Sequence, residues 1–126
     1  GAGWQTRLWA HHALGNIGII LGDLDTVERA GHSILEICDA EGLHLPRAYG
    51  TALLGQYQYF RGGDLALAGR YLEAAIEGMR TLRDFGGMKI YGLVTAGTVA
   101  ATRGDYALAE AYATEAIGLP GTAWTA

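Results

Sequence analysis

The chain has 126 residues, half of them hydrophobic and 17% of them charged, with a formal net charge of −4 at pH 7. This composition excludes a disordered segment, because it is sufficient to bury a core, and it disfavours direct nucleic-acid contact, because the nine Lys and Arg residues are spread along the chain. The single cysteine, Cys38, excludes an internal disulfide and favours a cytoplasmic location.

The hydropathy and the start of the chain bear on two further classes. No apolar run reaches the roughly 18 residues of a transmembrane helix, so no membrane association is expected. The start, from Gly1 to Trp4, has neither the basic nor the apolar segment of a secretory signal, and it lacks an initiating Met. We therefore expect one domain, residues 1–126, that is a fragment of a longer protein.

Six helices are predicted in chain order. Apolar residues recur at helical spacing in segments near 4–21, 24–41, 46–61, 65–84, 88–103 and 106–118. Pro46 suits the first turn of the third helix, Gly86 and Gly87 break the chain before the fifth, and Pro120 stops the sixth. No segment alternates with a period of two, so strands are not expected and the fold class is all-α.

A Gly-Asp pair recurs at a constant interval of 41 residues, as Gly22-Asp23, Gly63-Asp64 and Gly104-Asp105. Each glycine is expected to end a helix in the left-handed conformation, and each aspartate to cap the next helix by accepting free backbone N–H groups. The pairs divide the chain into three helix-pair repeats, near 4–41, 46–84 and 88–118. This register favours a stacked α-α superhelix, or solenoid, over the alternative of a plain up-and-down bundle.

Glycine is unusually common for a helical protein, with 20 residues. Several fall inside predicted helices, where each costs about 0.5–1 kcal/mol relative to Ala. The expected compensation is a close approach between helices, which small residues allow. The helical glycines are Gly15, Gly18, Gly31, Gly50, Gly55, Gly69, Gly78, Gly92 and Gly97.

The Gly-Asp turn, a small residue eight positions before the Asp (Gly15 and Gly97) and Ala four and eleven positions after it (Ala68, Ala75; Ala109, Ala116) resemble the tetratricopeptide repeat. The resemblance covers nearly the whole chain. The sequence departs from it in its period of 41 instead of 34. In the second copy Gln56 replaces the small residue, with Gly55 one place away, and the first copy has Val27, Gly31 and Ile34 where the family prefers Ala, an aromatic residue and Ala.

Repeats of this length, with the turn Arg61-Gly62-Gly63-Asp64, are similar to those in the C-terminal sensor regions of large bacterial transcription regulators. The resemblance implies a right-handed superhelix in which the first helix of each pair lines a concave surface. It places ligand-facing positions 14, 11, 7, 4 and 3 residues before each Asp. The candidate groove residues at such positions are Trp9, His12, Asn16, Tyr57, Phe60, Arg61, Tyr91 and Thr98.

Aromatic, hydrogen-bonding and cationic side chains of this kind suit a protein or peptide segment, including another domain of the same chain. The alternative for the aromatic residues is that they fill space between helices, and for Arg61 that its charge stabilises a helix end. The leading hypothesis is a protein–protein or intramolecular interaction module of a bacterial transcription regulator. A sensor of a small-molecule effector in the same groove, and a homodimer formed through uncapped repeat ends, remain as alternatives.

An enzyme is the least favoured class, and no catalytic residue, metal or cofactor is predicted. His11 and His12 point about 100° apart on one helix, and no Cys/His pair has zinc-ligand spacing. The one serine, Ser33, lies within a helix without a nucleophile motif, and Cys38 is expected in the core.

Overall fold

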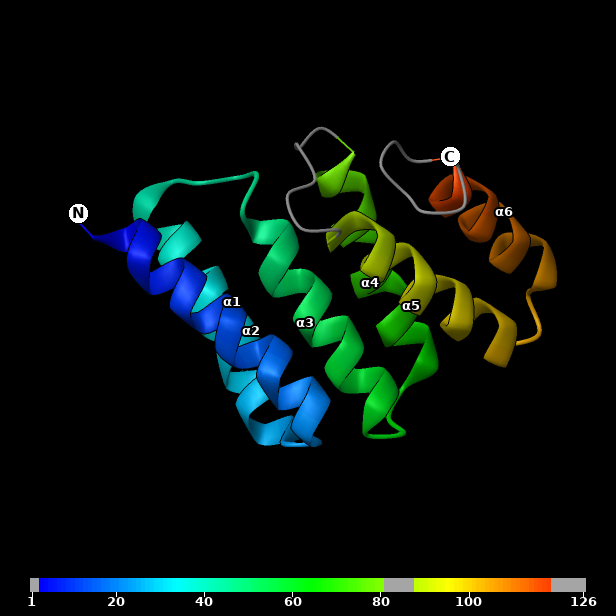
Figure 1. Ribbon diagram of the computed structural model, residues 1–126, viewed down its shortest axis with the longest axis horizontal. Coiled ribbons are helices and arrows are strands. Elements are labelled where there is room, and N and C mark those ends of the chain that lie inside the picture. The colour runs from blue at the N-terminus through cyan, green and yellow to red at the C-terminus, as the bar shows by residue number, and fades with distance from the viewer. Residues whose placement is uncertain (1–2, 81–87, 119–126) are drawn as a thin grey trace.

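The computed structural model describes residues 3–80 and 88–118, and every regular element in these residues is a helix (Figure 1). The prediction of an all-α fold is confirmed. The six helices of the described residues are α1 (Trp4–Leu21), α2 (Leu24–Glu41), α3 (Arg47–Phe60), α4 (Leu65–Met79), α5 (Met88–Thr102) and α6 (Tyr106–Ile117). None of the helices in this part of the chain has both the length and the apolar character needed to cross a membrane.

The helix boundaries lie within one residue of the prediction, except at the end of α4. That helix ends at Met79 with Arg80 as its C-cap, and the predicted continuation over 81–84 falls outside the described residues. The predicted breaks at Gly86-Gly87 and at Pro120 also fall outside them. Pro46 precedes the first residue of α3, with a helical φ of −67°.

The three predicted aspartate caps are confirmed. Asp23 accepts the backbone N–H of Thr26 at 3.3 Å, and Asp105 accepts that of Leu108 at 3.1 Å. Asp64 accepts two N–H groups, from Ala66 at 2.9 Å and Leu67 at 3.1 Å. Each carboxylate thus satisfies donors that the first helical turn leaves free.

The left-handed glycines confirm two of the three predicted helix ends and correct the third. Gly22 and Gly104 have φ of 73° and 82°, as predicted for the residue before the Asp. In the second repeat the left-handed residue is Gly62, with φ of 69°, and the expectation for Gly63 was wrong. The closing backbone hydrogen bond shifts in the same way: Asp23 and Asp105 donate to Gly18 and Ala100, whereas Gly63 donates to Gln58.

The shift at Gly62 sets the register of α3 against α1 and α5. Counted from the left-handed glycine, Gly55 is the equivalent of Gly15 and Gly97, because each precedes its glycine by seven residues. Equivalent positions in the three first helices are therefore 40 residues apart between α1 and α3 and 42 apart between α3 and α5. The 41-residue interval still holds for α2, α4 and α6, which follow the Asp caps.

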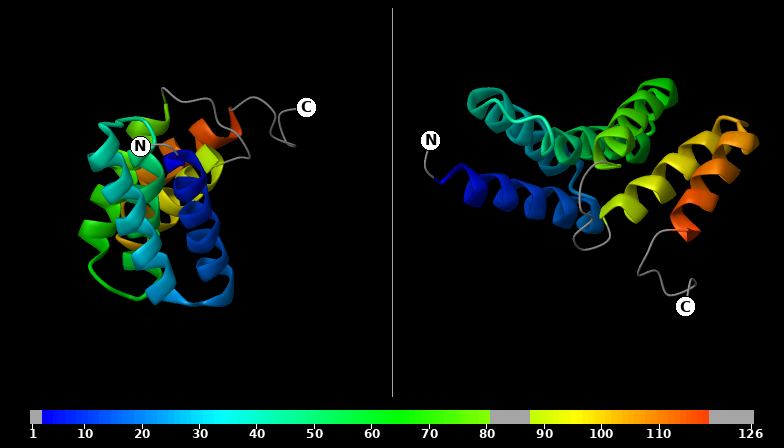
Figure 2. Two further views of the ribbon diagram at one scale, coloured as in Figure 1. Left: turned by 90° about the vertical axis from the view of Figure 1, so that its left-hand side faces the viewer. Right: turned by 90° about the horizontal axis from the view of Figure 1, so that it is seen from above.

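Consecutive helices pack against one another, and α3 also contacts α1 and α5. The helix pairs follow one another along the long axis of the molecule, from α1 and α2 at one end to α5 and α6 at the other (Figure 1). Seen from above, α1 and α5 lie on the same side of the α3–α4 pair (Figure 2). The first helices of successive pairs are thus neighbours, since α3 contacts both α1 and α5.

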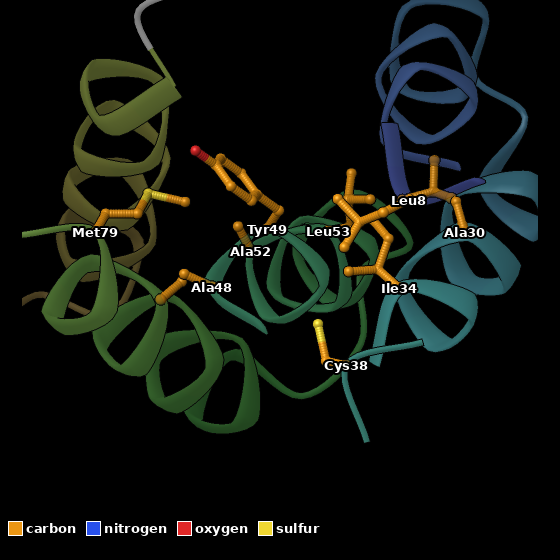
Figure 3. Close-up of a cluster of buried hydrophobic side chains, with 11 residues drawn as sticks. Leu8, Ala30, Ile34, Cys38, Ala48, Tyr49, Ala52, Leu53 and Met79 are labelled. Atoms are coloured by element: carbon orange, nitrogen blue, oxygen red, sulfur yellow. The ribbon is translucent and has the colours of Figure 1, made fainter. Parts of the chain in front are cut away.

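Two clusters of buried side chains hold the helices together. The first joins α1 to α4 and contains Leu8, Val27, Ala30, Ile34, Cys38, Ala48, Tyr49, Ala52, Leu53, Ala75 and Met79 (Figure 3). The second joins α4, α5 and α6 and contains Ala68, Leu72, Ile76, Leu93, Ala96, Val99, Tyr112 and Ala116. Cys38 lies in the first cluster as predicted, and burial raises the pKa of its thiol. A buried thiol with a raised pKa is a structural residue and a poor nucleophile.

Helical glycines mark the places where helices approach most closely. A Cβ on Gly50 would lie 2.9 Å from the carbonyl oxygen of Gly31, so α2 and α3 cross backbone to backbone. A Cβ on Gly15 would lie 2.5 Å from the side chain of Leu53, which α3 inserts between α1 and α2. These contacts show that the glycines in this half of the chain permit tight packing, which offsets their cost in the helix.

Candidate partner-binding groove

Three aromatic rings from α1 and α3 form one cluster. The ring centroids are 5.6 Å apart for Trp9 and His12, 5.3 Å for Trp9 and Tyr49, and 4.9 Å for His12 and Tyr49. All three pairs meet edge to face, which is the favourable geometry for aromatic quadrupoles. Trp9 remains half exposed, so this cluster offers an aromatic surface to a partner.

His12 is held in this cluster by Asn16, one turn along α1. The Asn16 amide nitrogen donates to the His12 carbonyl oxygen at 3.0 Å and lies 3.3 Å from His12 Nε2. Burial lowers the pKa of His12, because desolvation disfavours the charged imidazolium, and the ring is neutral at pH 7.

A narrow groove continues from the aromatic cluster across α3 to α5. We call it the α1–α3–α5 groove; its lining residues are His12, Asn16, Tyr49, Ala52, Leu53, Gln56, Met79, Tyr91 and Gly92. Met79 of α4 extends toward Tyr49 at its floor (Figure 3). The free volume at this floor is about 10 Å³, which is about the room that one water molecule requires.

Gln56 carries the chemistry of the groove. Gln56 is only 2% exposed and lines the groove. No fully buried side-chain N or O atom in the described part of the chain lacks a hydrogen-bond partner. A desolvated amide with two donors and one acceptor is a site that a peptide backbone would satisfy.

Two rows of equivalent positions recur on the first helices of the three pairs. Thirteen residues before the left-handed glycines stand Trp9, Tyr49 and Tyr91, which are all aromatic. Six residues before these glycines stand Asn16, Gln56 and Thr98, which all carry hydrogen-bonding side chains. On α1 and α3 these positions lie beside or in the groove, whereas Thr98 of α5 lines a separate hollow.

The structure brings together four of the residues expected in the groove from the sequence. Trp9 and His12 belong to the aromatic cluster, and His12, Asn16 and Tyr91 line the groove itself. Thr98 lies on α5 but lines a separate hollow against α6, and its hydroxyl donates to the carbonyl of Val94 at 2.9 Å.

The three candidates from the second repeat lie beside the groove. Tyr57 packs against the first core cluster, and the Arg61 guanidinium carbon lies 5.4 Å from the centre of its ring. Arg61 Nε also donates to the Gln58 side chain at 3.2 Å. Phe60 is exposed and meets Tyr59 edge to face near the α3–α4 turn.

Tyr49 and Gln56 are the residues that the sequence did not place in the groove. Both precede by one residue the positions that were counted from Asp64, because α3 ends one residue earlier than the Gly-Asp pattern predicts. The signal was present in the sequence as Gly55, which stands one place from the position that Gly15 and Gly97 occupy.

The described residues contain no group of three or more His, Cys, Asp or Glu side chains that could hold a metal ion. The groove offers aromatic area and hydrogen-bonding groups to a ligand.

No protein-family model, curated protein or solved structure matches the chain.

Proposed function

We propose that the chain is an interaction module whose helix pairs stack as a tetratricopeptide-like superhelix and bind a segment of protein in the α1–α3–α5 groove. The segment belongs to another protein or to another domain of the same chain. The wider role that the sequence resemblance suggests is that of a regulatory region in a bacterial transcription regulator, in which binding at the groove biases a neighbouring domain.

The repeated turn geometry supports the stacked arrangement. Each of the three helix pairs is joined through a left-handed glycine, a closing backbone hydrogen bond and an aspartate cap, and the second turn has one additional residue, Gly63, before its Asp. Stacking helix pairs that are joined by similar turns generates an extended surface from the first helices.

The Gln56 amide is the observation that carries the binding proposal. Gln56 is only 2% exposed and lines the groove, and a peptide carbonyl or N–H group that enters the groove would form a hydrogen bond with its amide. Asn16 and Trp9 on the adjacent helix add a second amide and an aromatic face, so a segment lying across α1 and α3 would find both kinds of contact.

The size of the groove favours a segment over a small-molecule effector. Sites for small molecules typically enclose about 300–1,000 Å³, whereas the free volume at the groove floor is about 10 Å³. A peptide can lie above this floor and insert single groups.

The test is to select peptides from a random displayed library on the 126-residue chain and to measure their affinity by fluorescence anisotropy. Gln56→Leu removes the amide at nearly constant volume. We expect it to weaken the selected peptides about tenfold, since one hydrogen bond to a buried amide is lost.

Gln58→Leu is the matched control on the same helix, because the Gln58 side chain bonds Arg61 and does not line the groove. It should leave the affinity unchanged. The proposal fails if no peptide is enriched, or if both variants weaken the selected peptides equally.

A further inference from the structure

The two ends of the row of helices expose apolar faces. The equivalent faces inside the molecule are buried between neighbouring helix pairs. Consider first the side of each first helix that packs on the preceding pair. In α3 this side contains Leu53 and Leu54, which are 2% and 4% exposed. Their equivalents in α5, Thr95 and Ala96, are also buried.

In α1 the same positions are exposed. We call this set the leading face; it consists of Ala10, Ala13, Leu14 and Ile17, which are equivalent to Gly50, Leu53, Leu54 and Tyr57 of α3. Leu14 is 49% exposed and Ile17 is 51% exposed. The leading face carries no charged residue, and in this it resembles the side of α3 that packs on the preceding helix pair.

The opposite end has the complementary surface. Between α5 and α6 lies an open hollow of about 350 Å³, which we call the trailing hollow. Its lining contains no charged residue and consists of Leu93, Val94, Gly97, Thr98, Ala101, Ala109, Ala113 and Ala116. Exposed apolar hollows of this kind mark interaction sites.

The junction between the first two repeats shows what such a hollow holds. There α3 seats Leu53 against Gly15 and Leu54 against Gly31, at would-be Cβ distances of 2.5 and 2.9 Å. The equivalents of Gly15 and Gly31 at the other end are Gly97 and Ala113. A Cβ on Gly97 would meet only α6, at 3.7 Å, and Ala113 is exposed.

We propose that a second copy of this chain seats its leading face in the trailing hollow, head to tail. Leu14 of one copy then takes the place over Ala113 of the other that Leu54 takes over Gly31 within the chain. The repeat register argues for this occupant, because the chain itself supplies a counterpart to both halves of the interface that α3 forms with α1 and α2. Both halves are small or aliphatic and uncharged, so their union leaves no buried charge.

An interface between two different faces is heterologous, and it extends into chains of copies unless the rotation closes a ring. This proposal concerns surfaces at the two ends of the molecule and does not depend on binding in the α1–α3–α5 groove. Gln56→Leu should therefore leave self-association unchanged, which separates failure of this proposal from failure of the proposed function.

The experiment is sedimentation velocity on the 126-residue chain over a wide range of concentration, with two complementary variants. Leu14→Glu puts a charge on the leading face, and Ala113→Glu puts one in the trailing hollow. Both residues are exposed, so neither change should unfold the chain. The parent chain should form species larger than dimers as concentration rises, and each variant alone should stay monomeric.

An equimolar mixture of the two variants should form a dimer and nothing larger, because one intact leading face meets one intact trailing hollow. Leu45→Glu is the matched control, since Leu45 is 48% exposed in the α2–α3 connection and lies on neither face; it should associate like the parent. Ile17→Glu with Val94→Glu is a second pair that repeats the test at different positions.

Three results would overturn the proposal. A parent chain that stays monomeric at every concentration would show that the faces do not meet. Dimers of Leu14→Glu alone would mean that two trailing hollows pair with each other. A mixture of variants that stays monomeric, with both variants folded by circular dichroism, would show that association uses other surfaces.

Discussion

The junction of the first two repeats and the α5–α6 end of the molecule use the same positions in opposite ways. At the junction, Gly15 lies under Leu53, and the missing Cβ gives α3 room to pack between α1 and α2. At the end, Gly97 stands at the same position with only α6 near it. A helical glycine is therefore a sign of close packing only where a neighbouring helix covers it, and Gly97 marks a contact that the described residues do not make.

The largest effect on stability is expected from a substitution at the crossing of α2 and α3. Gly50→Ala would place a Cβ 2.9 Å from the Gly31 carbonyl oxygen and 3.1 Å from Ile34. Because backbone has to move, we expect a loss of about 1–3 kcal/mol in the free energy of unfolding, measured by urea denaturation.

Gly92→Ala is the matched change, since Gly92 is the equivalent of Gly50 at the crossing of α4 and α5. Its Cβ would lie 3.8 Å from Met79 and 3.9 Å from Ile76, which is ordinary contact. We expect a gain of about 0.5–1 kcal/mol from the helix preference of Ala. Equal losses at both positions would mean that the two crossings are equally tight, contrary to the structure.

The pairing of positions across the repeats depends on which glycine ends α3, and this can be tested at the turn. Gly62→Ala forces a side chain into the left-handed region at φ of 69° and should cost about 1–2 kcal/mol. Gly63→Ala should cost less, because its Cβ would meet only the side-chain ends of Gln58 and Arg61, which are free to move. The reverse order in urea denaturation would restore the register counted from Asp64.

Substitutions at Gly15 and Gly97 are expected to change the free energy of unfolding in opposite directions, by smaller amounts. Gly15→Ala gains helix preference but crowds the buried side chain of Leu53, so we expect a net loss of about 1 kcal/mol. Gly97→Ala has no such opposition and should gain about 0.5–1 kcal/mol. A loss at Gly97 under dilute conditions would mean that something already covers the α5–α6 end.

The helices could be predicted from the sequence because the residues that begin and end them act on backbone groups only a few positions away. Each Asp finds its N–H donors within three residues, and each turn glycine acts on its own φ, so boundaries and caps follow from the pattern. Of the positions counted from the Asp on α1 and α5, His12, Asn16 and Tyr91 line the groove, whereas Thr98 lines a separate hollow.

The second repeat shows where local information ends. Gly62 and Gly63 can both adopt the left-handed conformation, and the chain near them does not say which one does. The choice agrees with long-range packing: Gly50 must face Gly31, and Gly55 must face Leu72, whose side chain would lie 2.7 Å from a Cβ. A shift of one residue turns a helix face by about 100°, which is why Gln56 lies in the groove while Tyr57 packs on the core.

The smallest predicted effect concerns His12 and Val94, which occupy one position in the first and third repeats. Tyr49 of α3 lies over His12, whereas Val94 is 54% exposed.

Burial lowers the pKa of His12 below its ordinary 6.5, so the unfolded chain takes up the proton first as the pH falls. The contribution of this residue to stability is therefore fully present above pH 6.5 and is lost progressively as the pH falls from 6.5 through the lowered pKa of the folded chain. An NMR titration of the ring protons, assigned with a His12→Gln variant, should find the lowered pKa. Tyr49→Ala should raise it toward 6.5 by exposing the ring, and an unchanged pKa in that variant would mean that α3 does not cover α1 in solution.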